Sequence, residues 1–293
     1  MEIAQGIVKK CTWKVYKGNC LDTLRNMGDK NELVDCIVTS PPYFNRRSYG
    51  APPKCDGNIA KWLYASPGKP IEGEIGNSND KDKYIEDIGK VLEQCYRVLK
   101  NDKLMFINIA NTHKNLELLD FSSKFIDCAK NAGFIHWDTI IWVKENPMPP
   151  GTHGGYYLAQ GWEYILAFRK GEKVQIDSST IKIKTHFKCK KCGEENYLDS
   201  KITPNYLYSY IGCYGRKLNK TISHPAIFPI DIPEYCLGIA TKEGDVVLDP
   251  FVGSGTTLIA GIEQGLNVIG CELVPEIYEG LVSGMNLLSK KQI

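Results

Sequence analysis

The sequence predicts an α/β protein in which helices cover both faces of a central sheet. Short apolar, β-branched runs alternate along the chain with longer stretches whose apolar residues recur at helical spacing. Such alternation favours a sheet packed between two helical layers. The chain has 293 residues, of which 43% are hydrophobic, and it can bury the core that this architecture needs. We expect one main domain with a smaller inserted module.

Periodicity and stop signals predict the elements of the first half. Pro41 and Pro42 end one strand, because proline cannot donate to a sheet ladder. Gly133 stands where a helix C-cap is expected. In order, the pattern predicts a strand at 13–16, a helix at 20–27, a strand at 35–39, a helix at 84–99, a strand at 104–109, a helix at 116–131, and strands at 139–143 and 163–168.

Three segments interrupt the alternation. Residues 44–83 and 146–161 are rich in Gly and Pro, and we expect loops there, the first long enough to be functional or disordered. Residues 170–220 are rich in lysine and mark the inserted module. After it, the pattern predicts a helix at 233–241, a strand at 246–248, a helix at 256–264, a strand at 268–271 and a helix at 275–288.

Composition excludes several protein classes. No run approaches the roughly 18 apolar residues that span a bilayer, and the first ten residues lack a signal-peptide core, so a soluble cytoplasmic protein is expected. The 11 cysteines are scattered through a long chain, which favours reduced thiols. The net charge is +2, yet residues 170–220 hold 11 Lys or Arg against 5 Asp or Glu. Charge alone leaves open a phosphate-binding surface or a solvated loop.

A nucleotide-binding pattern lies near the C-terminus. A buried strand at 246–248 runs into a glycine turn and then a helix, which brings a ligand close to backbone N–H groups. The next strand ends near Glu272, 23 residues after Asp249, where a carboxylate can accept hydrogen bonds from ribose hydroxyls. Leu258 replaces the third glycine of a dinucleotide fingerprint, and no lysine follows as in a phosphate loop. An adenosine-type ligand is therefore expected.

A second pattern, Thr39-Ser40-Pro41-Pro42-Tyr43, suits chemistry on an exocyclic amine. Such an amine is a poor nucleophile, because its lone pair is delocalised into the base ring. Acceptors aimed at its hydrogens favour the attacking form and act mainly in the transition state. The Ser40 hydroxyl and the Pro41 carbonyl can supply them, and Tyr43 can stack on an extruded base. Taken alone, the Pro-Pro-Tyr triplet is better explained as a proline-stopped strand with a buried tyrosine.

Together these segments resemble the amino-methylating DNA methyltransferases, in the group whose catalytic motif precedes the cofactor motif. Residues 39–43 resemble their Ser/Asp-Pro-Pro-Tyr motif, and 249–257 their Asp-Pro-Phe-x-Gly-Ser-Gly-Thr-Thr loop. Asn19 stands where that family often has Asp. Further similar segments are Trp142-Val143-Lys144 with Asn146 and Pro147, Trp162-Glu163-Tyr164 with Phe168, and His224-Pro225-Ala226 with Phe228-Pro229.

The resemblance implies a Rossmann-like class I fold with a seven-stranded mixed sheet. It implies a catalytic part at 1–169, an inserted target-recognition module at 170–222 and a cofactor-binding part at 223–293. It also implies a base flipped out of double-stranded DNA and direct methyl transfer without a covalent intermediate. The catalytic residues would be Ser40, Pro41, Pro42 and Tyr43. The residues expected to bind S-adenosylmethionine are Asn19, Thr39, Asp249, Pro250, Phe251, Gly253, Ser254, Gly255, Thr256 and Glu272.

Candidate DNA contacts and a candidate metal site lie outside these motifs. Phosphate contacts are expected from Arg46, Arg47, Lys188, Lys190 and Lys191, although the two arginines can equally be solvated loop residues. Cys189 and Cys192 have the spacing of half a zinc knuckle. Cys213 and His186 would complete a structural zinc site, and the alternative is a vestigial turn without metal.

The first position of the catalytic motif bears on the target base. In the family that the chain resembles, Asp there is common for adenine N6 and Ser for cytosine N4, and this chain has Ser40. Cytosine N4 is therefore the favoured target, with adenine N6 as the alternative. Other interpretations are a methyltransferase of RNA or of a protein glutamine, and a non-catalytic DNA-binding protein on a degenerate scaffold. A role in a restriction–modification system is expected, whereas the existence of a restriction endonuclease partner and the oligomeric state stay open.

Overall fold

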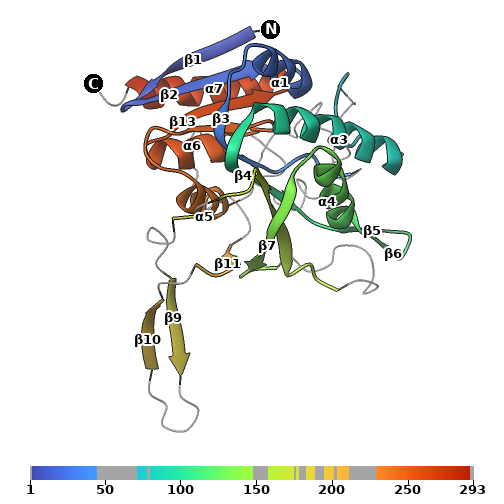
Figure 1. Ribbon diagram of the computed structural model, residues 1–293, viewed down its shortest axis with the longest axis vertical. Coiled ribbons are helices and arrows are strands. Elements are labelled where there is room, and N and C mark those ends of the chain that lie inside the picture. Colours follow the sequence, from blue (N-terminus) through green and yellow to red (C-terminus); the bar gives the residue numbers. More distant parts are fainter. Residues whose placement is uncertain are drawn as a thin grey trace, which may run out of the picture.

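The fold is organised around one mixed sheet of nine strands in the order β1-β2-β13-β12-β3-β4-β8-β7-β11 (Figure 1). The computed structural model describes residues 2–44, 71–77, 80–147, 158–174, 176–177, 183–188, 195–200, 203–210 and 229–290. The strands of this sheet are β1 Glu2–Val8, β2 Cys11–Lys17, β3 Val34–Thr39, β4 Leu99–Ile109, β7 Ile135–Lys144, β8 Trp162–Lys170, β11 Tyr206–Ser209, β12 Val246–Asp249 and β13 Asn267–Glu272.

Strand direction sets where the functional loops emerge. Strands β2, β13, β12, β3 and β4 form a parallel block, whereas β8 runs antiparallel to both β4 and β7. The carboxyl ends of β3, β12 and β13 therefore lie side by side at one edge of the sheet. The amino end of β8 reaches the same edge, because Tyr164 pairs with Ile109 at the carboxyl end of β4.

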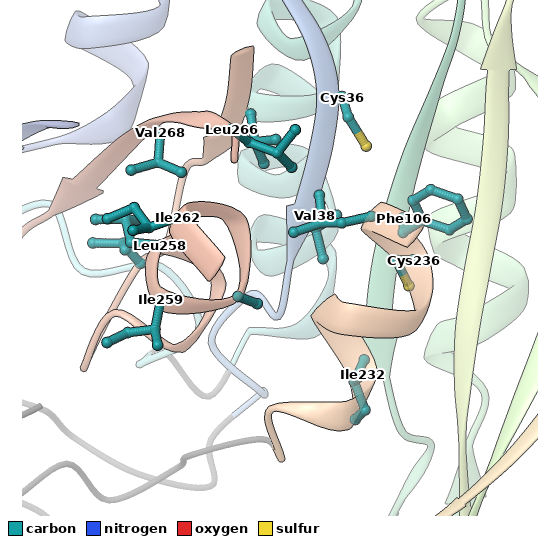
Figure 2. Packing of buried hydrophobic residues seen from close by; sticks show 14 of the residues in the cluster. Cys36, Val38, Phe106, Ile232, Cys236, Leu258, Ile259, Ile262, Leu266 and Val268 are labelled. Carbon is teal, nitrogen blue, oxygen red and sulfur yellow. The ribbon is translucent and has the colours of Figure 1, made fainter. Parts of the chain in front are cut away.

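Two apolar cores lie on the two faces of the sheet. The helices are α1 Cys20–Asp29, α3 Lys81–Val98, α4 Phe121–Asn131, α5 Asp231–Ala240, α6 Thr256–Glu263 and α7 Pro275–Lys290. Helices α5, α6 and α7 cover one face, and α1, α3 and α4 cover the other. The side chains of β3 alternate between the two cores, with Cys36 and Val38 facing α5 and α6 in Figure 2 and Ile37 facing the opposite layer. The α/β fold with helices on both faces is thus confirmed.

The sheet has nine strands rather than the seven expected. The first additional strand, β1, pairs antiparallel with β2 through a turn at Lys9, whose φ is 56°. Gly6 of β1 lies against the ring of Trp13, where an added Cβ would come within 2.8 Å of the indole. The second additional strand, β11, pairs in parallel with β7 at the other edge. Both lie at edges, where half-exposed strands carry a weak apolar pattern.

The helix expected at 116–131 begins only at Phe121. A small hairpin precedes it, formed by β5 Thr112–Lys114 and β6 Glu117–Leu119. Asn115 and Leu116 have positive φ in the hairpin turn, which a helix does not allow. Asp120 then caps the helix by accepting the Ser123 N–H at 3.2 Å. The cap outweighs the helical spacing of the preceding leucines.

The segment expected as an inserted module divides into two parts. Strands β9 Ile183–Lys188 and β10 Glu195–Ser200 form a separate antiparallel hairpin, which projects away from the sheet in Figure 1. Strand β11 lies within the same segment yet completes the main sheet. The predicted module therefore contributes a strand to the main sheet. In the described part of the chain, no helix is both long and apolar enough to cross a membrane.

Candidate active site

A buried carboxylate joins the two sequence motifs at the edge of the sheet. The Thr39 hydroxyl, at the end of β3, donates to Asp249 Oδ1 at 2.6 Å, although the two residues are 210 positions apart. The Thr257 hydroxyl in α6 donates to Asp249 Oδ2 at 2.7 Å, and the Phe251 N–H donates to Oδ1 at 3.0 Å. Asp249 is 1% exposed, and burial raises its pKa to about 6. Asp249 and Thr39, both expected at the cofactor, thus bond to each other.

The cofactor loop, residues 250–255 between β12 and α6, owes its conformation to its glycines. Gly253 and Gly255 have φ of 51° and 87°, in the left-handed region that favours glycine. Gly255 is the N-cap residue of α6, and no side chain caps that helix. The Val252 N–H donates to the Cys271 carbonyl at 3.1 Å, which ties the loop to β13. The N-terminus of α6 can therefore offer backbone donors to a ligand.

Glu272 ends β13 beside this loop and is 7% exposed. Burial raises its pKa to about 7, while the backbone N–H groups of Val274 and Gly253 keep it from rising further. The Val274 N–H donates to Glu272 Oε1 at 2.8 Å. Asn19 lies next to it in space, because the Gly18 N–H donates to the Glu272 carbonyl at 2.8 Å. The Asn19 side chain caps α1 by accepting the Leu21 N–H at 2.9 Å.

The predicted catalytic motif, Ser40 to Tyr43, follows Thr39 directly and is held in place by side chains of α3 and α4. The Tyr84 hydroxyl, from α3, donates to the Pro42 carbonyl at 2.9 Å. Phe44, 4% exposed, packs against Tyr84 and Phe121 with ring centroids 5.5 and 5.3 Å apart. Neither the Ser40 hydroxyl nor the Pro41 carbonyl bonds to another residue within the described ranges. Both acceptors can therefore be directed at a substrate amine.

Tyr43 is anchored by a buried ion pair. Its hydroxyl donates to Glu163 Oε2 at 2.7 Å, and Lys144 Nζ lies 2.8 Å from Glu163 Oε1. The side chains of Lys144 and Glu163 are only 7% and 9% exposed. The ammonium group also lies over the ring of Trp142, 5.3 Å from its centroid. Strands β7 and β8 thus contribute to the site that β3 begins.

The structure brings the predicted catalytic and cofactor residues to one edge of the sheet. Pro250 and Ser254 lie with the glycines on the turn between β12 and α6, and Thr256 is the first residue of α6. Among the DNA and metal candidates, Lys188 and His186 belong to β9. The remaining candidates, Arg46, Arg47, Cys189, Lys190, Lys191, Cys192 and Cys213, lie outside the described residues. The described residues contain no group of three or more His, Cys, Asp or Glu side chains placed to hold a metal ion.

Several supporting residues were not identified individually from the sequence. Thr257 and Tyr84 hold the two motifs in place, and Glu163 and Lys144 anchor Tyr43. Thr257 had a local signal, since it lies on the first turn of the helix after the glycine loop. The contacts of Glu163 and Lys144 depend on strand order and register, and that of Tyr84 depends on how α3 packs on the sheet; local patterns give neither.

The arrangement fits an adenosine-type cofactor. The left-handed glycines let the backbone approach a ligand, and Glu272 ends the neighbouring strand beside them. A carboxylate in that position can accept ribose hydroxyls, and the α6 N-terminus can donate to an anionic group. Ser40 lies one residue beyond the Thr39–Asp249 bond, so an amine held there would lie beside this ligand.

Comparisons with known proteins agree with this site. A family model described as DNA methylase, for N6 and N4 methyltransferases, matches residues 34–283. Type II methyltransferase M.BglII of Bacillus subtilis is 27% identical over 280 residues, which cover 91% of this chain and 67% of that protein. Type II methyltransferase M.SmaI of Serratia marcescens is 25% identical over 314 residues, covering 94% and 90%.

Solved structures share the fold. The PvuII DNA methyltransferase, which is cytosine-N4-specific, superposes with a TM-score of 0.66 at 16% identity and covers 93% of both chains. A DNA modification methylase of Thermus thermophilus, complexed with S-adenosyl-L-methionine, gives a TM-score of 0.61 at 20% identity, covering 94% of this chain and 93% of that one. Because the family model spans most of its length, this chain belongs to the N6/N4 family of DNA methylases, the S-adenosylmethionine-dependent methyltransferases of amino groups in DNA.

Proposed function

We propose that the amino group modified by this methyltransferase is N4 of a cytosine in double-stranded DNA, within a restriction–modification system. One observation supports methyl transfer to an amine at this site, and the serine of the motif supports the choice of base. The 2.6 Å hydrogen bond between Thr39 and Asp249 brings Ser40 and Pro41 to the edge of the glycine loop. A nitrogen held by Ser40 would thereby lie beside a methyl donor held by Gly253, Gly255 and Glu272. DNA as the substrate implies a cytoplasmic location.

The chain's own residues would activate and orient the amine. Bound S-adenosylmethionine supplies an electrophilic methyl carbon on a positively charged sulfur. The Ser40 hydroxyl and the Pro41 carbonyl would accept the hydrogens of the amine, which favours the pyramidal nitrogen with a localised lone pair. The nitrogen would form the new bond to carbon as the carbon–sulfur bond breaks, and the displaced proton would leave to water. Tyr43 would stack on the base once it has left the duplex.

The serine of the motif favours cytosine over adenine. A hydroxyl is shorter than a carboxylate, so it must lie closer to the amine, which suits a smaller ring. The fold similarity to the cytosine-N4-specific PvuII enzyme agrees with this choice. Digestion of methylated duplex DNA to nucleosides, followed by mass spectrometry, tests it. N4-methylcytosine is expected, and N6-methyladenine as the only product would defeat the cytosine assignment. Ser40→Ala, as the control, should lose transfer and retain cofactor binding.

We also propose that the lysine-rich segment contacts DNA phosphates. Lys188 ends β9, and Lys190 and Lys191 follow it in the sequence, as part of a segment with a net charge of +6. Each phosphate that a lysine neutralises should contribute about 0.9 to the slope of log affinity against log salt. Neutralising the three lysines should therefore flatten that slope. An unchanged slope would mean that these lysines face solvent, and Arg46 and Arg47 would be tested in the same way.

Zinc in this segment remains a prediction with its own test. Cys189, Cys192, Cys213 and His186 would be the ligands, and the ion would be structural, since the transfer itself needs no metal. Metal analysis of the purified protein, with unfolding followed before and after chelation, decides the question. An occupied site would show one zinc per chain, and removal of the ion would lower DNA affinity. A folded, active and metal-free protein would rule out the requirement.

A further inference from the structure

We infer that Glu163 and Lys144 are positioning residues which fix the ring of Tyr43 against the target base. The inference rests on the proposed function, in which Tyr43 stacks on the flipped base. The chain of contacts runs from the Tyr43 hydroxyl to Glu163 Oε2 at 2.7 Å and from Glu163 Oε1 to Lys144 Nζ at 2.8 Å. It links the catalytic loop after β3 to two strands on the far side of β4.

The carboxylate is rigidly placed by the sheet. Glu163 lies on β8 in register with Trp142 of β7, two residues before Lys144. The Lys144 backbone N–H donates to the Gly161 carbonyl at 2.8 Å, which fixes the start of β8 beside the end of β7. A side chain on paired strands is positioned more precisely than one on a loop. The loop-borne tyrosine thus takes its position from the sheet.

A contribution to folding stability alone does not explain why Lys144 and Glu163 form a buried ion pair. With side chains 7% and 9% exposed, Lys144 and Glu163 have lost most of their hydration. In such surroundings the desolvation of two ions commonly exceeds their mutual attraction, and an apolar pair of similar size would serve the fold as well. The Tyr43 hydroxyl, as the third member, gives the carboxylate its second partner. This charge-assisted hydrogen bond is strong and directional, so it can fix the orientation of the Tyr43 ring.

Both ends of the Tyr43 side chain are held. Its backbone follows two prolines with fixed φ and precedes Phe44, which is buried between Tyr84 and Phe121. Its hydroxyl is held by Glu163. With both ends fixed, little rotational freedom is left for the ring to lose when a base stacks on it, and such preorganisation favours the chemical step. The anchor should therefore affect turnover and base stacking more than cofactor binding.

Three variants separate this role from a structural one. Tyr43→Phe keeps the ring and removes the hydroxyl. The pair Lys144→Met with Glu163→Leu removes both charges together, so that neither ion is left unpaired, and it also removes the acceptor. The pair Lys144→Met with Glu163→Gln removes both charges and keeps an acceptor oxygen for Tyr43. Lys90→Met is the matched control, since Lys90 ion-pairs on α3 with Glu86 and Asp87.

The measurements are kcat and KM for duplex DNA, S-adenosylmethionine affinity, and fluorescence of 2-aminopurine at the target position. Losing a hydrogen bond to a charged group should lower kcat by about tenfold in Tyr43→Phe and in the Leu pair. Combining these changes should cost no more than either alone. In both variants the 2-aminopurine emission should rise as stacking weakens. The Gln pair should stay within about twofold of the wild type, and Lys90→Met should be unchanged.

The outcomes distinguish the inference from the function on which it rests. Additive losses in the combined variant, or full turnover in folded Tyr43→Phe, would overturn the inference while leaving the methyltransferase assignment intact. If the Leu pair does not fold, the comparison of Tyr43→Phe with the Gln pair still decides, because only Tyr43→Phe removes the hydrogen bond while both variants remove part of the buried network. A wild-type protein that transfers no methyl group to any DNA amine would overturn the proposed function, and the inference with it.

Discussion

The two loops at the edge of the sheet are built in different ways. The cofactor loop depends on local features, namely left-handed glycines at 253 and 255 and an aspartate that accepts an N–H two residues further on. The catalytic loop depends on side chains from elsewhere, with Tyr84 holding Pro42 and Glu163 holding Tyr43. One loop is therefore specified by its own sequence, and the other by the surrounding fold.

This difference predicts where substitutions that affect each loop should lie. A change in the cofactor loop should act where it is made, because few distant contacts transmit it. A change in the supports of the catalytic loop should act from β7, β8 or α3 without touching the motif. Asp249 is the exception, since it accepts hydrogen bonds from Thr39 on one side and from Thr257 on the other. The three predictions below test this division.

The largest effect is expected from Gly255→Val. Valine at φ 87° is strained by about 1–3 kcal/mol, and the change would displace the backbone that a ligand approaches. We expect S-adenosylmethionine affinity to fall by at least about 100-fold while the fold survives. Gly244→Val is the matched control, because its φ is 89° and its added Cβ would meet no atom within 4 Å. Calorimetric titration with S-adenosylmethionine checks the result. Normal binding by folded Gly255→Val would refute the claim that the loop's own glycines determine cofactor binding.

An intermediate effect is expected where the loops join. Asp249→Asn places an amide donor among three donors, which should lower the free energy of unfolding by about 1–3 kcal/mol and reduce both cofactor affinity and kcat. The isosteric changes Thr39→Val and Thr257→Val should divide these effects. The first should lower kcat more than affinity, and the second affinity more than kcat, each by about fivefold. If kcat and cofactor affinity fell equally in both threonine variants, the effects of the two loops would not be separable at Asp249.

A graded effect, which needs no substitution, is expected from pH. Cofactor binding favours ionised Glu272, whose pKa burial raises to about 7, so affinity should rise about tenfold per pH unit below 7 and level off above it. The free energy of unfolding of the cofactor-free protein should instead decrease as pH rises. The unfolded chain loses this proton near pH 4.5, and the folded chain near 7, so the free energy of unfolding falls as pH rises between them. Glu272→Gln should flatten the affinity profile and reduce the slope of the stability profile, to which buried Asp249 also contributes because its pKa is raised to about 6. A pH-independent affinity in the wild type would exclude the Glu272 carboxylate from the cofactor site.

The sequence predicted the local loop well and the distant supports poorly. Glycines after a buried strand identify a ligand loop without any knowledge of its neighbours, and Pro41 and Pro42 mark the end of a strand in the same way. Nothing near Tyr43 in the sequence indicates Glu163, because that contact requires β8 to lie two strands away and in one register. The resemblance to a family located the segments but not the hydrogen bonds between them.

The errors in the predicted elements have the same origin. Strand β1 has a weak signal, because its outer side chains face solvent, with Ile3 48% and Ile7 61% exposed. The leucines at 116, 118 and 119 suggested an earlier helix start, yet Leu116 and Leu118 are 67% and 53% exposed in the β5–β6 hairpin. Periodicity describes burial, and burial at edges and turns is decided by the rest of the fold.

The position of β11 limits how the segment 170–222 could be exchanged between related enzymes. Leu207 of this strand is buried in the core, and its Ser209 carbonyl accepts the Trp142 indole N–H at 3.3 Å. The Ser209 hydroxyl also bonds to Asp231 at the start of α5. A chimaera that transplanted 170–222 as one block would remove this edge strand together with the β9–β10 hairpin. A graft that joins the donor after β8 and returns to this chain before β11 would preserve the host's sheet, and with it the scaffold on which Lys144 and Glu163 stand.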